Sequence, residues 1–240
     1  MQLFYCPDIN PDQIYTLGKE ESQHLIKVLR QKEGDKVHLT DGLGNLFEAE
    51  ILEANPKSCI LKVISTQEEY NKRDYYLHVA IAPTKNIARI EWFLEKATEM
   101  GIDEITPIIC QHSERENIKH ERLEKIIISA MKQSLKAYMP KLNTPTPLLE
   151  VIRNSSETKK LIGYCVGENR NQIKDIYKPK ESVLIVIGPE GDFSEKEVQE
   201  ALKNNFQTIT LGKERLRTET AGLYVVNIIH SLNQWENQSY

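Results

Sequence analysis

Short stretches in which hydrophobic and polar residues alternate dominate the first seventy positions of the chain, as is typical of half-buried β-strands. "KVHLT" and "LFEAEIL" flank the turn-forming residues "DGLGN", and "SCILKVIST" predicts a further strand. "LFYC" and "IYTL" are weaker strand candidates. One helix is expected in "ESQHLIKVLRQ", where Leu25, Val28 and Leu29 share a face. Several short strands with one helix predict a small barrel over residues 1–70.

From residue 75 onward, hydrophobic strands alternate with amphipathic helices. The predicted strands are "YYLHVAIA", "ITPIIC", "LIGYCV", "SVLIVIG" and "TITLG", and the predicted helices are "IARIEWFLEKATEM", "ERLEKIIISAMKQSLKAY", "SEKEVQEALKNN" and a last helix through "AGLYVVNIIHSL". A proline-rich connection contains Pro140, Pro145 and Pro147. This alternation predicts a parallel sheet covered on both faces. With the polar stretch at 67–74 as a linker, we expect an α/β domain over residues 75–240.

Composition restricts the choice of partners and compartment. The 240 residues carry a net charge of −4, so a nucleic acid would have to be bound by local basic patches. The four cysteines and six histidines show no metal-binding spacing, and we therefore expect no metal site and no disulfide framework. No signal-peptide pattern or membrane-spanning stretch is evident, so the expected location is the cytoplasm, with no membrane partner.

Three predicted strand ends in the last third of the chain carry glycines or turns. They are "GYCVGE" at 163–168, "GPEG" at 188–191 and "LGKERLRTETA" at 211–221. Ligands of open α/β sheets bind beyond the carboxyl ends of the strands, so neighbouring strands would bring these loops into one pocket. No phosphate-binding glycine motif is present, and Glu190 would repel a phosphate. A cationic ligand such as S-adenosylmethionine fits better; the alternative is a β–α turn that binds nothing.

Two motifs near the C-terminus resemble those of a known enzyme family. "IGPEGDFSEKE" followed by "LGKERLRTETA" is similar to the signature of the RsmE family, SPOUT-class enzymes that methylate N3 of a uridine in 16S ribosomal RNA of the small subunit. "HLIKVLRQKEGDKVHLTDGLGN" and "IEWFLEKATEMGIDEITPI" extend the resemblance to nearly the whole chain. Asp192 departs from it, because many members have a glycine there, and "SLKAYMP" lacks an expected arginine.

The resemblance implies a PUA-like RNA-binding barrel followed by a SPOUT trefoil-knot domain, in which the last segment is threaded through a loop. It also implies a homodimer with its active sites at the subunit interface. S-adenosylmethionine would bind in the three loops. The expected cofactor-binding residues are Gly163, Val166, Gly188, Pro189, Glu190, Gly191, Leu211, Gly212, Leu216, Thr220 and Ala221.

Methylation of uracil N3 requires loss of the N3 proton, and the resulting negative charge needs a positioned cation. Arg217 is the expected cation; the alternative is a surface ion pair with Glu214 or Glu219. Glu219 is the second expected catalytic residue, as a proton acceptor or as the group that orients Arg217. Glu190 could serve either purpose or counter the sulfonium. Thr220 is also expected to cap the final helix.

RNA would be bound by two groups of basic residues. His24, Lys27 and Arg30 are expected on one helix face of the barrel, and Lys85, Arg89 and Arg115 near the active site. An ordinary solvated helix face is the alternative for the first group.

Two other functions remain open at this point. The chain could be a SPOUT methyltransferase for another position, such as a ribose 2′-O or a transfer-RNA base. It could also be a non-catalytic RNA-binding protein of ribosome assembly.

Overall fold

The computed structural model describes residues 2–164 and 171–236 of the chain. The chain divides into two compact units. The first comprises Met1–Lys72 together with Ile128–Met139, and the second comprises Arg73–Ile127 and Pro140–Tyr240. The polar segment at 67–74 thus contains the division between them, and twelve residues from the middle of the chain join the first unit.

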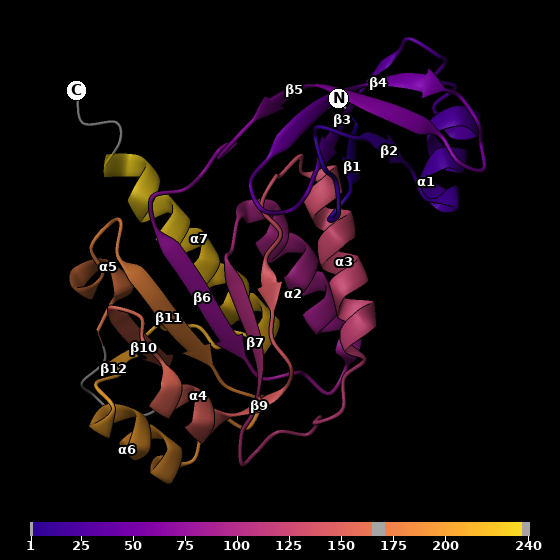
Figure 1. Cartoon of the computed structure of the whole chain (residues 1–240). Helices are drawn as coiled ribbons and strands as arrows, with labels where there is room; N and C mark the ends of the chain where they lie inside the picture. Colours follow the sequence, from indigo (N-terminus) through magenta and orange to yellow (C-terminus); the bar gives the residue numbers. More distant parts are fainter. Residues whose placement is uncertain (1, 165–170, 237–240) are drawn as a thin grey trace. The chain divides into compact units, whose positions relative to one another are not determined.

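The first unit is built on a mixed five-stranded half-barrel (Figure 1). Its strands lie in the order β1 (Leu3–Tyr5), β3 (Lys36–Thr40), β4 (Leu46–Glu53), β5 (Ile60–Gln67) and β2 (Ile14–Thr16). Alternate residues of β3 and β4, such as Leu39, Phe47 and Ala49, are fully buried in its core with Leu25. The small barrel expected for this part of the chain is present as this half-barrel sheet.

The turn between β3 and β4 depends on glycine. Gly42 and Gly44 have φ values of 78° and 107°, which side chains rarely adopt. A Cβ atom on Gly44 would lie 2.3 Å from Cζ of Tyr138. The Gly44 N–H donates to the Ala137 carbonyl at 2.9 Å, and the Met139 N–H donates to the Gly42 carbonyl at 2.8 Å. These bonds explain why Ile128–Met139 belongs to the first unit.

Two helices differ from the sequence-based prediction. The first is split into α1 (Lys19–Gln23) and a π-helical turn, η1 (His24–Val28), and it ends before Arg30, whose φ is 57°. The prediction that Arg30 shares a helix face with Lys27 is therefore wrong. Helix α3 (His120–Gln133) ends five residues earlier than predicted, and Leu135 then takes a φ of 56°.

The second unit contains a parallel sheet, as predicted. The strand order is β12 (Gln207–Ile209), β10 (Lys159–Gly163), β11 (Ser182–Ile187), β6 (Tyr76–Ile81), β7 (Glu104–Ile109) and β8 (Lys141–Leu142), with the short β9 (Thr146–Pro147) also paired to β7. β11 reads as a continuous hydrophobic run because both of its faces are covered. The strands β12, β10 and β11 are neighbours, so their following loops meet at one edge of the sheet.

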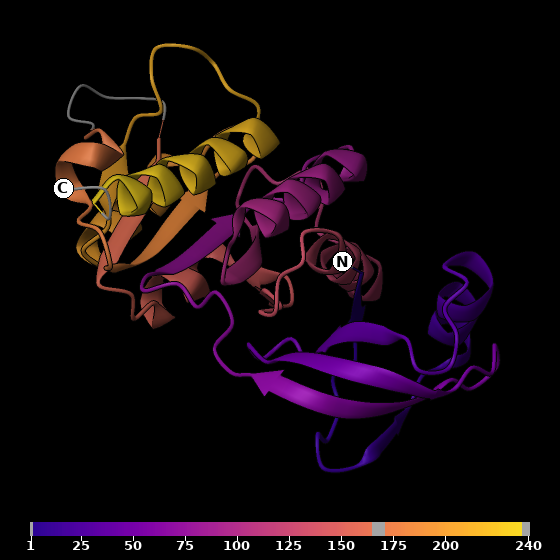
Figure 2. The same ribbon diagram turned by 90° about the horizontal axis from the view of Figure 1, so that it is seen from above.

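Helices cover both faces of this sheet (Figure 2). α2 (Ile87–Met100) and α7 (Thr218–Glu236) pack together on one face, and α4 (Leu148–Asn154) and α6 (Glu195–Lys203) pack together on the other. No element was predicted between the helix after β7 and β10; the structure has β8 and β9 in the proline-rich connection and α4 directly after it. The short α5 (Ile173–Ile176) was not predicted. The threading of the last segment through a loop stays a prediction.

Two further features bear on partners and ligands. No helix in the described part of the chain is long and apolar enough to cross a membrane. Among residues 2–164 and 171–236, no group of three or more His, Cys, Asp or Glu side chains is arranged to hold a metal ion.

Candidate active site

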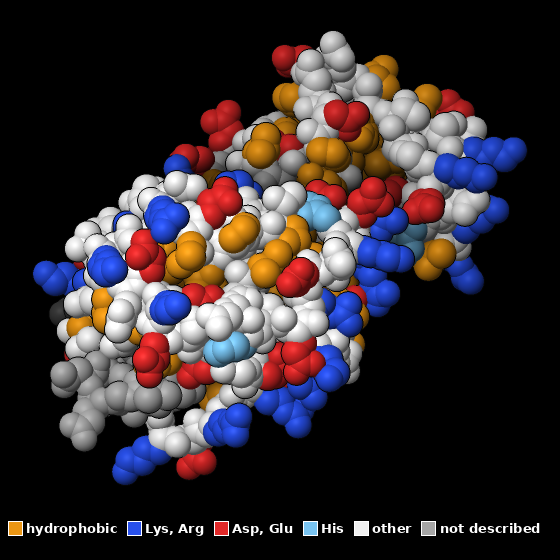
Figure 3. Space-filling model, turned by 90° about the horizontal axis from the view of Figure 1, so that it is seen from below, with side chains coloured by type: hydrophobic (Ala, Val, Ile, Leu, Met, Phe, Trp, Pro, Cys, Tyr) orange, Lys and Arg blue, Asp and Glu red, His pale blue; other side chains and the backbone are white. Residues whose placement is uncertain are grey.

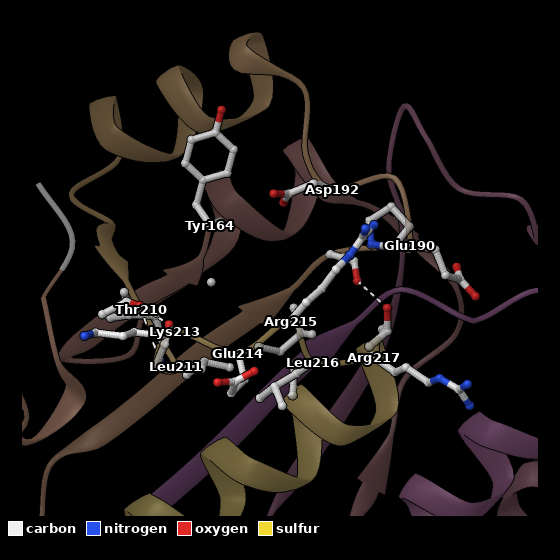
Figure 4. A pocket seen from close by; sticks show the side chains of 18 of the residues that line it. Tyr164, Glu190, Asp192, Thr210, Leu211, Lys213, Glu214, Arg215, Leu216 and Arg217 are labelled. Carbon is white, nitrogen blue, oxygen red and sulfur yellow. Dashed lines mark hydrogen bonds between the residues drawn. The ribbon is translucent and has the colours of Figure 1, made fainter. Parts of the chain in front are cut away.

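A pocket of about 780 Å³ lies at the carboxyl ends of β10, β11 and β12, within the second unit (Figure 4). The described start of the first glycine-containing loop and residues of the other two therefore line one cavity, as the sequence predicts; residues 165–168 lie outside the described part of the chain. Its volume is in the range of small-molecule and cofactor sites. Ten of the residues that the sequence singled out line it: Arg89, Gly163, Gly188, Pro189, Glu190, Leu211, Gly212, Leu216, Arg217 and Ala221.

Other lining residues were not predicted individually. They are Tyr164, Ile187, Asp192, Ile209, Thr210, Lys213, Glu214, Arg215 and Thr218. Each lies in or beside one of the three loops, so loop membership was the signal that could have identified them. Of the residues expected to bind the cofactor or to be catalytic, Gly191, Glu219 and Thr220 do not line the pocket, and Val166 lies outside the described residues.

The loop after β11 is anchored by the capping box that the sequence predicts. The Ser194 Oγ accepts from the Glu197 N–H, and the Glu197 carboxylate accepts from the Ser194 N–H at 2.8 Å. The other carboxylate oxygen of Glu197 accepts from the Gln111 N–H, also at 2.8 Å. The buried Glu197 thus ties the start of α6 to the loop after β7.

The glycines of the "GPEG" turn have a packing role. A Cβ on Gly188 would lie 3.0 Å from the Phe193 ring, and one on Gly191 would lie 3.1 Å from Cβ of His112. His112 in turn forms a hydrogen bond from Nδ1 to the Asp192 carbonyl at 3.0 Å. Close approach between protein segments therefore accounts for Gly191 without a ligand.

The first residue of α7 joins two walls of the pocket. The Thr218 hydroxyl donates to the Gly188 carbonyl at 3.0 Å, the bond drawn as a dashed line in Figure 4. The Ala221 N–H donates to the Arg217 carbonyl at 2.8 Å, which starts the helix. Thr220 is already the third residue of α7 and is exposed, so the prediction that it caps this helix is wrong.

The two residues expected to be catalytic have different surroundings. Arg217 is exposed, and within the described chain it forms no ion pair with Glu214 or Glu219. Figure 4 shows it at the Glu190 end of the pocket, opposite Tyr164 and Lys213. Glu219 is only 6% exposed, and its Oε1 lies 3.7 Å from Nε of Arg89. Its Oε2 is buried and has no hydrogen-bond partner in the described residues.

Charged residues of the loops after β6 and β7 contact one another and the pocket residue Glu190. Glu190 accepts a hydrogen bond from the Lys85 N–H at 3.2 Å. The Lys85 ammonium pairs with Glu114 at 2.8 Å, in an exposed position where such a pair contributes little stability. Arg115 donates to the Lys85 carbonyl from Nη2 at 2.7 Å and to the Thr84 carbonyl from Nε at 3.2 Å. Arg115 thus contacts Lys85, and Arg89 lines the pocket; the binding of RNA by these three residues stays a prediction.

The three residues of the first unit that are expected to bind RNA differ in their exposure to solvent. Lys27 and Arg30 are exposed, whereas His24 is half-buried against Phe4 and lies 3.0 Å from the Gln2 amide. Basic and acidic side chains are interspersed on the face of the molecule drawn in Figure 3.

Comparison with known proteins identifies both parts of the chain. Residues 71–230 match a family model described as an RNA methyltransferase domain, and residues 17–64 match an RNA methyltransferase PUA domain. Ribosomal RNA small subunit methyltransferase E of Mesomycoplasma hyopneumoniae is 32% identical over 72% of this chain and 75% of its own length.

Solved structures extend the similarity over the full fold. A probable rRNA methyltransferase from Porphyromonas gingivalis is 44% identical, with a TM-score of 0.93, and covers 98% of this chain and 100% of its own. Ribosomal RNA small subunit methyltransferase E from Neisseria gonorrhoeae, solved with S-adenosylmethionine, is 25% identical, with a TM-score of 0.86 over 97% of this chain and 98% of its own. The chain therefore belongs to the RsmE family of RNA methyltransferases.

Proposed function

We propose that this protein transfers a methyl group from S-adenosylmethionine to N3 of a uridine in 16S ribosomal RNA of the small subunit. The observation that carries the proposal is the pocket that described residues at the carboxyl ends of β10, β11 and β12 line together. Relatives with the same fold are named as small-subunit rRNA methyltransferases, and the one from Neisseria gonorrhoeae binds S-adenosylmethionine.

The residues of the pocket fit this cofactor. Glu190, Asp192 and Glu214 supply negative charge suited to a sulfonium and an ammonium group, and Lys213 and Arg215 supply positive charge suited to a carboxylate. Glycines and apolar side chains such as Ile187, Ile209 and Leu211 provide much of the remaining lining, which suits an adenine ring and a ribose. The absence of a phosphate-binding loop is consistent with a cofactor that has no phosphate.

When bound, the cofactor would supply an electrophilic methyl group, so that the N3–C bond forms as the S–C bond breaks. Uracil N3 is a nucleophile only after its proton has left, and the negative charge then spreads onto O2 and O4. A fixed cation at these oxygens stabilises the anion, and each such donor is typically worth about 3–4 kcal/mol. Arg217 is our candidate, because it lies at the pocket rim and its guanidinium stays charged.

A carboxylate is needed to receive the N3 proton or to orient the cation. Glu190 is exposed and lines the pocket, so it can be reached by a substrate. Glu219 is buried and pairs with Arg89, which favours an orienting role over proton transfer. We therefore propose Glu190 as the proton acceptor and Glu219 as the residue that positions Arg89.

RNA would be held by basic side chains in both units. Lys27 and Arg30 are exposed and suited to phosphate contacts, and His24 is close to them in the sequence. Lys85 and Arg89 are candidates for phosphates close to the target nucleotide. The resemblance to the SPOUT class also favours a homodimer, and sedimentation should then give twice the chain mass at micromolar concentration.

A nucleoside analysis tests the proposed reaction. Small subunits lacking the modification would be incubated with the protein and labelled S-adenosylmethionine, and their RNA digested and analysed by mass spectrometry. We expect N3-methyluridine, with a rate that falls at least roughly 100-fold in Arg217→Ala while cofactor affinity is retained. A 2′-O-methyl product would support the alternative target. Cofactor uptake without any product on rRNA would also contradict the proposal, and no uptake at all would indicate a non-catalytic binding protein.

A further inference from the structure

Three loops at the carboxyl ends of β6, β7 and β11 are joined by hydrogen bonds beside the pocket. From the β7 loop, Gln111 bonds to Glu197 and His112 bonds to the Asp192 carbonyl. From the β6 loop, the Lys85 N–H bonds to the Glu190 carboxylate. Arg115 and the Lys85–Glu114 ion pair connect the β7 loop to the β6 loop.

The contacts of Arg115 are unusual for a residue that was predicted to bind RNA. Its Nε lies 3.2 Å from the carbonyl oxygens of both Thr84 and Lys85, and its Nη2 lies 2.7 Å from the Lys85 carbonyl. The side chain is half-buried, and Thr84 beneath it is fully buried. A charged donor that bridges two consecutive carbonyls fixes the orientation of the peptide between them.

The backbone held in this way leads directly to the pocket. The Lys85 N–H, in the peptide whose carbonyl is that of Thr84, donates to Glu190, which lines the pocket. The next residue, Asn86, caps α2 by accepting from the Ala88 N–H at 3.1 Å. Within the first turn of α2, Arg89 also lines the pocket. A shift of the Thr84–Lys85 peptide would therefore move both Glu190 and Arg89.

We propose that Arg115 is a positioning residue of the active site, which acts by holding the Thr84–Lys85 peptide so that its N–H fixes the Glu190 carboxylate at the pocket rim. The inference deepens the proposed function and rests on it, because it concerns the same pocket. Arginine is suited to this task, since its planar fork reaches two acceptors at once, whereas lysine offers a single charged centre. The ion pair between Lys85 and Glu114 is exposed and cannot replace it.

The test compares Arg115→Ala and Arg115→Lys with the wild-type protein by calorimetric titration of S-adenosylmethionine. We expect both variants to weaken cofactor binding by roughly 3- to 10-fold, because neither restores the two-carbonyl contact. Glu190→Ala should weaken binding similarly, and the double variant Arg115→Ala/Glu190→Ala should bind no more weakly than Glu190→Ala alone. Arg153→Ala, which breaks the surface pair with Glu200, is the matched control and should bind normally.

The salt dependence of RNA affinity separates positioning from phosphate contact. If Arg115 positions the loop, its variants should keep the wild-type slope of affinity against salt. If Arg115 instead contacts a phosphate, Arg115→Ala should lower the slope by about one, Arg115→Lys should restore it, and cofactor affinity should not change. That result, or additive effects in the double variant, would overturn the proposal. A wild-type protein that takes up no cofactor would instead contradict the proposed function.

Discussion

Replacing Thr218 by valine should loosen the pocket while leaving the shape of the side chain almost unchanged. In the wild-type protein its hydroxyl donates to the Gly188 carbonyl at 3.0 Å and joins the start of α7 to the loop after β11. Thr218 is only 6% exposed, so water replaces this bond poorly. A net hydrogen bond contributes about 0.5–1.5 kcal/mol, and an acceptor left unsatisfied costs about 1–3 kcal/mol.

These magnitudes predict that Thr218→Val lowers the free energy of unfolding of the second unit by about 1–2 kcal/mol. For a domain of this size, the melting temperature should fall by about 2–8 °C. Both Thr218 and Gly188 line the pocket, so S-adenosylmethionine affinity should also fall, by roughly 3- to 10-fold if about 1 kcal/mol is lost from the bound state. Urea titration and calorimetric titration measure the two effects.

Thr218→Ser is the matched control, because serine keeps the hydroxyl and loses only a methyl group. It should bind the cofactor within about twofold of wild type and lose less stability than the valine variant. If the two variants behave alike, the bond between α7 and the β11 loop does not hold the pocket together. Unchanged stability in Thr218→Val would refute the reasoning more directly.

Two further predictions concern stability and RNA. Burial favours the neutral form of Glu104, but hydrogen bonds from Tyr76, Asn143 and Lys141 outweigh this effect and lower the pKa of the carboxyl to about 2. Glu104→Gln should therefore lower the free energy of unfolding by about 1–3 kcal/mol at pH 7. The difference from wild type should disappear as the pH falls from about 4.5 to 2. Urea titrations that give the same difference at every pH would contradict this prediction. The double variant Lys27→Ala/Arg30→Ala should lower the slope of log RNA affinity against log salt concentration by about two and leave cofactor affinity unchanged. An unaltered slope would show that RNA is bound elsewhere.

The sequence predicted those parts of the fold that local pattern determines. The alternation of strands and helices after residue 75 was sufficient for the parallel sheet, and Ser194 with Glu197 was sufficient for the start of α6. The pocket could be predicted because carboxyl ends of parallel strands share one edge, and three glycine-containing loops followed such strands. The order of β12, β10 and β11 still had to come from the structure.

What could not be predicted depends on contacts between residues distant in the sequence. The hydrophobic pattern around Arg30 predicted that this residue belongs to the helix. In the structure it takes a left-handed conformation after the π-helical turn. Arg115 was assigned to RNA from its charge alone, because no local pattern reveals that its partners are carbonyls thirty residues earlier. The same holds for Glu219, whose burial against Arg89 depends on how α7 packs on α2.

The departure at Asp192 follows from the backbone conformation at that position. Asp192 has a φ of 60°, the left-handed region that favours glycine and that aspartate and asparagine enter more readily than other residues. Its carboxylate accepts from the Phe193 N–H at 2.8 Å, which stabilises the turn in a way that glycine cannot. Asp192 also lines the pocket, so it adds a negative charge beside the proposed sulfonium site. A substitution that seemed to weaken the resemblance thus preserves the turn and is compatible with the ligand that the pocket is proposed to bind.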